Sequence, residues 1–162
     1  MTALEFQQQL KDELVKVFKN CKYKDPSGNR VPLNFFTQHL PVVDREDEDD
    51  PFPYIIVKLA GGDDPGNGPG NYSIRAILVI GVYDEDRDAQ GHQDVLNIIH
   101  KIYERFSLDP RLDDEAIYLI ENGSGDNGFH WAIQEDAYYP YFIGACTMNF
   151  AIPSIRREDK YS

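Results

Sequence analysis

The sequence has 162 residues, of which 41% are hydrophobic, and it carries a formal net charge of −12. This length favours a single domain, residues 1–162, large enough to bury a core without help from a metal or a disulfide. The excess of acidic residues argues against nonspecific binding to nucleic acid and against docking on an anionic membrane surface, because both depend on Lys and Arg.

The cysteines and the first residues point to a reduced, cytoplasmic compartment. Cys21 and Cys146 lie far apart in the sequence, so we expect two free thiols, with Cys146 as a small core residue. The segment after Met1 leads directly into a charged amphipathic pattern, which is not typical of a signal peptide. No apolar stretch approaches the roughly 20 residues that a membrane span needs.

An amphipathic helix is predicted over residues 3–20. Thr2 and Glu5 have the spacing of a capping box, which stabilises a helix start by about 1 kcal/mol. An apolar stripe follows at helical spacing, made of Phe6, Leu10, Leu14, Val17 and Phe18. Residues 25–28 then predict a turn, and residues 31–36 a short strand that its proline confines to a sheet edge.

Residues 44–50 carry six acids and one base, which is typical of a solvated loop. A metal site is the less favoured alternative for this run. The strand predicted at residues 54–59 is joined to the next strand by the glycine-rich residues 61–71, so we expect an antiparallel pair with a long mobile tip. This loop lacks the lysine of a P-loop and contains Asp63 and Asp64, which argues against phosphate binding.

The longest apolar strand is predicted at residues 72–83. Between Ala76 and Val82 both of its faces are apolar, as in a central strand that is covered on two sides. A helix follows, and its apolar stripe consists of Val95, Ile98, Ile99, Ile102, Tyr103 and Phe106. The two helices account for one cover. We expect either a neighbouring subunit or residues 129–152 to supply the other.

The link before this helix carries Asp84, Asp86 and Asp88 at alternate positions, as an EF-hand loop does at its start. Ala89 and Val95 stand where that loop needs glycine and a bidentate glutamate, so we exclude calcium binding by this motif. Acidic residues ahead of a helix favour its positive end, which is the simpler interpretation.

The last third of the chain predicts three strands and a tail. The strands fall at residues 117–121, 129–134 and 141–152, with a turn-rich loop at 122–128. One face of the last strand is expected to carry Phe142, Gly144, Cys146, Met148, Phe150 and Ile152. Residues 154–162 form a charged tail that we expect to be mobile.

Catalytic motifs are missing from the sequence. The four histidines form no HExxH motif or cluster with cysteine, and no GxSxG elbow is present. The many carboxylates fall in loops, where nothing marks a pair with different environments. We therefore expect no enzymatic activity, no cofactor and no bound metal.

Several of these patterns occur together in a recognisable order: the N-terminal helix, the strand at residues 52–57, the long apolar strand, the helix containing residues 94–99 and the closing segment 139–153. In this order the chain, from about residue 4 to residue 157, resembles the tail terminator (tail completion) proteins of long-tailed bacteriophages. Related proteins serve contractile tails and phage-tail-like bacteriocins. The insert at residues 61–71 and the acidic run at residues 44–50 depart from the family pattern.

The resemblance implies an α/β subunit that closes into a homo-hexameric ring on the tail tube, ends tube polymerisation and presents a surface to the head connector. Its partners would be other copies of itself, the tail tube protein, the connector protein and duplex DNA passing through the lumen, in a virion tail assembled in the bacterial cytoplasm. Tyr139, Arg156 and Arg157 are expected to contact partner proteins. The acids Asp63, Asp64, Asp84, Asp86 and Asp88 are candidates for the lumen wall, where they would repel DNA phosphates.

The sequence therefore predicts an α+β domain with a mixed or mostly antiparallel sheet and two amphipathic helices on one face. Two alternatives remain open for its function. One is an acidic DNA mimic that inhibits a nuclease or restriction enzyme, which the net charge favours. The other is a small hydrolase of unrecognised type.

Overall fold

Two long antiparallel strands, β5 (Tyr72–Tyr83) and β9 (Tyr141–Ile152), form the centre of the fold. The computed structural model describes residues 1–41, 50–66, 72–113, 115–120, 127–135 and 138–154. Within these residues the main sheet has seven strands in the order β3-β4-β5-β9-β7-β6, and β8 also pairs with β9. All pairings are antiparallel except β3 with β4. The predicted α+β class with a mostly antiparallel sheet is confirmed.

The remaining elements are short or flank this centre. Their bounds are α1 (Ala3–Val17), β1 (Tyr23–Lys24), β2 (Arg30–Val31), β3 (Asn34–Thr37), β4 (Tyr54–Asp63), α2 (His92–Leu108), β6 (Arg111–Leu112), β7 (Ala116–Tyr118) and β8 (His130–Ile133). β1 and β2 form a separate hairpin.

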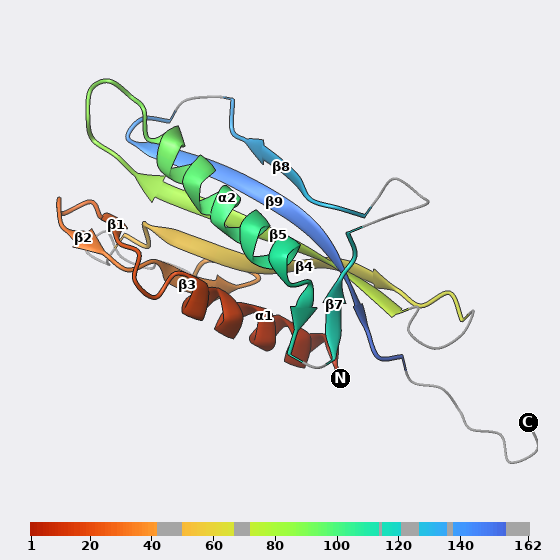
Figure 1. Cartoon of the computed structure of the whole chain (residues 1–162). Helices are drawn as coiled ribbons and strands as arrows, with labels where there is room; N and C mark the ends of the chain where they lie inside the picture. The colour runs from red at the N-terminus through yellow and green to blue at the C-terminus, as the bar shows by residue number, and fades with distance from the viewer. Residues whose placement is uncertain (42–49, 67–71, 114, 121–126, 136–137, 155–162) are drawn as a thin grey trace, which may run out of the picture.

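Both helices pack on the same face of the sheet, as expected (Figure 1). The core lies between them and the sheet, because alternate residues of β5 and β9 point toward the helices. Its largest fully buried side chains are Phe6, Phe18, Phe106, Phe150, Leu10, Leu14, Ile55, Leu78, Ile80, Ile98, Ile102 and Leu112. Cys146 is buried in this core and Cys21 is partly buried, and both are free thiols.

The capping box at α1 is confirmed, with Thr2 and Glu5 exchanging hydrogen bonds of 3.3 and 3.1 Å. The helix ends at Val17 rather than at residue 20. Phe18 is the C-cap, and its side chain is buried in the core. Phe18 is the last apolar residue of the stripe, and Lys19 and Asn20, which follow it, are exposed.

Three strand predictions need adjustment. The strand expected at residues 31–36 is divided into β2 and β3 around Pro32, and β3 lies at the sheet edge as predicted. β4 does not stop at residue 59 but continues to Asp63, with an irregularity between Leu59 and Gly61. Pairing with β5 extends it, which no local pattern could reveal. The strand expected at residues 117–121 is β7, and it ends at Tyr118.

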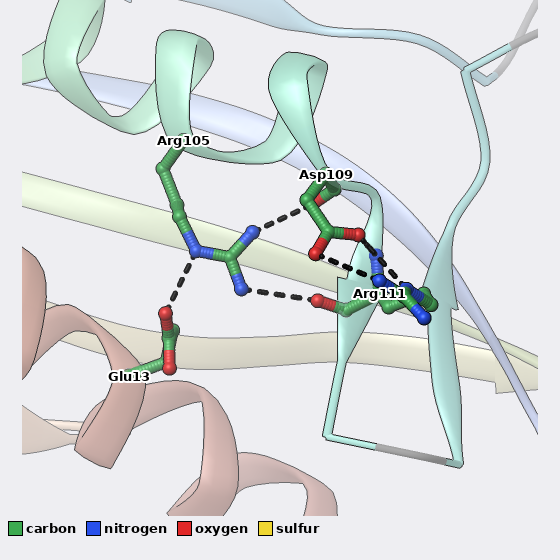
Figure 2. A network of polar contacts seen from close by, with 4 residues as sticks. All are labelled: Glu13, Arg105, Asp109 and Arg111. Atoms are coloured by element: carbon green, nitrogen blue, oxygen red, sulfur yellow. Dashed lines mark hydrogen bonds and ion pairs between the residues drawn. The ribbon is translucent and has the colours of Figure 1, made fainter.

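The helices are also joined by a polar network (Figure 2). Arg105 of α2 contacts Glu13 of α1, with 2.7 Å between Nε and Oε1. The same guanidinium donates to the carbonyl oxygens of Asp109 and Arg111, at 2.5 and 3.0 Å. Arg111 donates to the Asp109 carboxylate, which lowers the pKa of that carboxyl. One arginine therefore fixes both the spacing of the helices and the chain that leaves α2.

Several predicted segments lie outside the described residues. They are most of the acidic run, from 44 to 49, the end of the glycine-rich loop at 67–71, the first part of the turn-rich loop at 121–126, and the tail at 155–162 with Arg156 and Arg157.

Candidate assembly surface

Neither α1 nor α2 packs on the opposite face of the sheet, and we call that face the open face. Strand register places its residues in rows, because residues paired across strands point to the same side. Ile56, Val79, Ala145 and Ala132 form one such row. The next row contains Lys58, Ile77, Thr147 and His130. Ile77, Val79 and Ala145 are only partly buried.

Aromatic residues cover one end of the open face. Phe52 stacks between Tyr54 and Tyr141, with ring centroids 4.8 and 4.7 Å away. Gly81 lies under this cluster, since a Cβ there would meet the ring of Tyr54 and lie 2.8 Å from Phe52. The Tyr141 hydroxyl donates to Asp50, which raises the pKa of that tyrosine.

The opposite end of the open face is polar. Arg75 is exposed and donates to Asn149, with 3.4 Å between Nε and Oδ1. Asn149 in turn donates to Asn127 at 3.1 Å. The open face thus runs from an aromatic end through a small aliphatic centre to a polar end that carries a cation.

Of the two covers expected for the second face, a neighbouring subunit or residues 129–152, the structure excludes the second. β9 lies in the sheet itself, and β8 pairs edge to edge with β9, so this segment widens the sheet instead of crossing it. The alternation of apolar and polar residues at 129–134 predicts a strand, but it does not show whether that strand lies in the sheet beside β9 or packs on the face of the sheet. In the part of the chain that the structure describes, the aliphatic centre of the open face has no second layer.

The five acids predicted for a lumen wall fall into two groups. Asp63 pairs with Ser73 near the start of β5, and Asp64 follows it. Asp84, Asp86 and Asp88 follow the end of the same strand. The two groups therefore lie at opposite ends of a strand of 12 residues, roughly 40 Å apart at about 3.3 Å per residue.

The acids after β5 hold the β1–β2 hairpin in place. Lys24 contacts Asp84 and Asp86, at 3.4 and 2.9 Å. Hydrogen bonding to Asp86 raises the pKa of this lysine. Nearby Asp94, in the first turn of α2, has a raised pKa because it is partly buried and faces Asp84. No group of three or more metal-ligating side chains occurs among the described residues.

Tyr139, predicted to contact a partner, is exposed beside the aromatic end. Its hydroxyl donates to the carbonyl of Glu85. Tyr138 is also exposed, at 59%, and forms a bridge with Tyr141. Exposed tyrosines are common at protein interfaces, and the partner contact of Tyr139 stays a prediction.

A second feature, missed in the sequence, is an apolar hollow between α2 and β8, the α2–β8 groove. Its volume is about 340 Å³, and its lining consists of Leu96, Ile99, His100, Tyr103, Phe129 and Trp131. Tyr103 was predicted on the buried stripe of the helix but is 46% exposed, and Trp131 is 55% exposed. The sequence feature that could have indicated this groove is Trp131, the one tryptophan of the chain, which lies in a predicted strand with weak alternation.

Neither described helix is long and apolar enough to cross a membrane. A scan against protein-family models and a search of curated proteins both found no match to this chain.

Proposed function

We propose that this protein is a tail terminator, a structural subunit that closes into a hexameric ring on a tail tube, ends tube polymerisation and forms the surface that joins the tail to the head. The observation that carries the proposal is the open face, whose aliphatic centre lacks a second layer among the described residues. Partly buried aliphatic side chains in the middle of a sheet favour a protein partner, since burial removes their apolar area from water.

The surface is suited to assembly rather than to chemistry. Aromatic residues at one end supply large rigid contacts, and the polar end with Arg75 and Lys58 supplies directional ones. A standard protein interface buries about 1,600 Å² in total, which is about 800 Å² on each partner. Part of one side of a subunit supplies such an area. The tail tube protein, the connector and other copies of the chain are the partners of such a subunit.

The two acidic groups refine the proposed lumen wall. Since they lie at opposite ends of β5, both can border one channel only if β5 runs along it. We expect the acids in the channel to keep DNA phosphates from adhering, over a screening length of about 8 Å at physiological salt. We compare two charge-reversed variants, one at Asp63 and Asp64 and one at Asp86 and Asp88. The variant that slows DNA passage identifies the group that borders the channel.

The test uses tails purified without their terminator. Added protein should stop tube growth at a uniform length and permit joining to filled heads, as measured by negative-stain imaging and plaque formation. The double variant Ile77→Asp with Val79→Asp should fold but lose at least tenfold in capping, because two carboxylates would then be buried against the partner.

The matched control is Leu4→Asp, which places the same charge on an exposed apolar residue of α1, 75% exposed and away from the open face. This control should cap as the wild type does. Full capping by the double variant, or tubes of unchanged length with the wild type, would count against the proposal.

The acidic DNA mimic has less support. Its favouring feature is the charge of −12. The described acids are scattered over α1, α2 and several loops, and Asp63 and Asp64 lie at the opposite end of β5 from Asp84, Asp86 and Asp88. Inhibition of a nuclease by the monomer, with no effect on tails, would favour it.

A further inference from the structure

Two outer strands of the sheet carry no charged residue and no proline. β3 lies at the edge beside β4, and β8 borders the first part of β9, while the end of β9 pairs with β7 and then β6 (Figure 1). β3 and β8 each have four residues, and neither contains proline, lysine, arginine or an acid. Edge strands in soluble proteins are usually protected by such residues. Because β3 and β8 lack them, in a chain with 27% charged residues, the backbones of these two strands can accept a further strand.

The edge of β4 next to β3 is protected, unlike the edge of β3 itself. Beyond the end of β3, the side-chain amide of Gln38 pairs with the backbone of β4, accepting from the N–H of Leu59 and donating to its carbonyl, both at 3.1 Å. Gln7 donates to the same amide oxygen at 2.9 Å and so holds it in place. The fold therefore closes the edge of β4 with a side chain but leaves β3 without such a cap among the described residues.

The outward-pointing backbone groups of β8 and β3 are placed so that the two strands can form hydrogen bonds with each other. The Gln134 N–H donates to Ile143, so alternation turns the N–H and carbonyl of Trp131 outward from β8. The N–H groups of Asn34 and Gln38 donate toward β4, so Phe35 turns its N–H and carbonyl outward from β3. Trp131 and Phe35 both have their side chains on the helix face, since they align with buried Cys146 and Ile55.

Strand directions match as well. β3 is parallel to β4, and each later neighbour across to β8 is antiparallel to the one before it. A second copy placed beside β8 in the same orientation therefore presents its β3 antiparallel to β8, with its helices on the same side. In this arrangement Phe35 of the second copy lies against Trp131, at the mouth of the α2–β8 groove.

We infer that β8 of one copy pairs with β3 of the next copy. The part of the Phe35 side chain that its own core leaves exposed would then cover Trp131 at the α2–β8 groove. Main-chain hydrogen bonds give such strand addition its affinity, and a pocket for one side chain gives it specificity. The contact is heterologous, so repeated copies can close a ring, whereas β8 pairing with β8 would stop at a dimer. The inference rests on the proposed ring, and it leaves the open face to the tube or the connector.

Disulfide trapping tests the pairing. In a Cys21→Ser background, Ala132→Cys on β8 is combined with Asn34→Cys on β3, which face each other when Trp131 is opposite Phe35. Oxidation should give covalent ladders up to the ring size on denaturing gels, with or without tail tubes. Ala132→Cys alone should give no more than background dimer. Combination with Gly61→Cys is the negative control, because Gly61 pairs with Arg75 of its own chain and lies outside the proposed β3–β8 contact.

A second variant keeps the test independent of thiol chemistry. Ala132→Lys places an edge-protecting charge on an exposed residue, and it should abolish the ring while far-UV circular dichroism and the melting temperature stay unchanged. Ala60→Lys, exposed in the irregular part of β4, should leave the ring intact.

The outcomes separate this inference from the proposed function. Efficient cross-linking of Ala132→Cys alone would show β8–β8 pairing and overturn the inference. Capping of tubes by an Ala132→Lys protein would also overturn the inference, and so would the absence of any ladder both with and without tail tubes. The terminator proposal would survive each of these results if the wild type caps tubes. Ladders without any capping would support the pairing and sink the terminator proposal.

Discussion

At the scale of single residues, Gly81 decides how the aromatic end of the open face is built. It lies in the central strand with no Cβ, and the rings of Tyr54 and Phe52 occupy the space that a side chain would need. The aromatic cluster therefore depends on a position that the sequence presents only as a glycine within an apolar run. Periodicity identified the strand but could not show which rings fill the space.

Gly81→Ala should destabilise the fold by about 1–3 kcal/mol, because overpacking forces buried rings to move. Urea unfolding followed by tyrosine fluorescence measures the change. Gly61→Ala is the control, since nothing lies within 4 Å of a Cβ there. Equal stability of the two variants would contradict the close approach of the rings to Gly81.

Asp94 gives a pH dependence with a definite sign. Partial burial and Asp84 raise its pKa above the usual 3.8, so the folded state binds a proton more tightly than the unfolded chain does. This contribution is fully present below 3.8 and is lost as the pH rises through the raised folded pKa.

The variant Asp94→Asn should therefore gain stability relative to the wild type as the pH rises from about 3 to 7. Unfolding midpoints measured at several pH values test this. A stability difference that does not vary with pH would mean that Asp94 titrates alike in both states.

At the scale of elements, the sequence predicted the long strands and both helices because their patterns are local. β5 and β9 are long apolar runs, and α1 begins with a capping box that is formed as expected. The two-residue strands β1 and β6 were missed because so short a segment has no periodicity of its own and becomes a strand only by pairing with β2 or β7. The extension of β4 through two glycines was missed because it, too, depends on pairing, here with β5.

Substitution of Arg105 should lower the stability of the fold more than substitution of its partner Glu13. Arg105→Met leaves the carbonyls of Asp109 and Arg111 without their donor and should cost about 1–3 kcal/mol, whereas Glu13→Gln should cost less. A double-mutant cycle should give a coupling of about 1 kcal/mol, because both side chains are roughly one-fifth exposed. Zero coupling would show that Glu13 plays no part in fixing the helices.

At the scale of the whole molecule, the sequence predicted that the second face of the sheet needs a cover and offered two candidates, a neighbouring subunit and residues 129–152, of which the structure excludes the second. Apolar residues on both sides of β5 predicted two covers, and the described structure supplies one. The direction of β8 depends on its pairing with β9, and such long-range pairing leaves no trace in a single sequence. The same limit explains why the α2–β8 groove and the uncharged edges became visible only in the fold.

The side chain of Gln38 has a consequence for how far any added strand can slide. Because its amide already satisfies the backbone of Leu59, an incoming strand that shifts past the end of β3 meets no free donor or acceptor there. A one-residue slip would in addition turn every side chain to the wrong face. If β3 pairs with β8 of a neighbouring copy as inferred above, Gln38 would limit how far the two strands can slide and so would protect the edge against misaligned pairing.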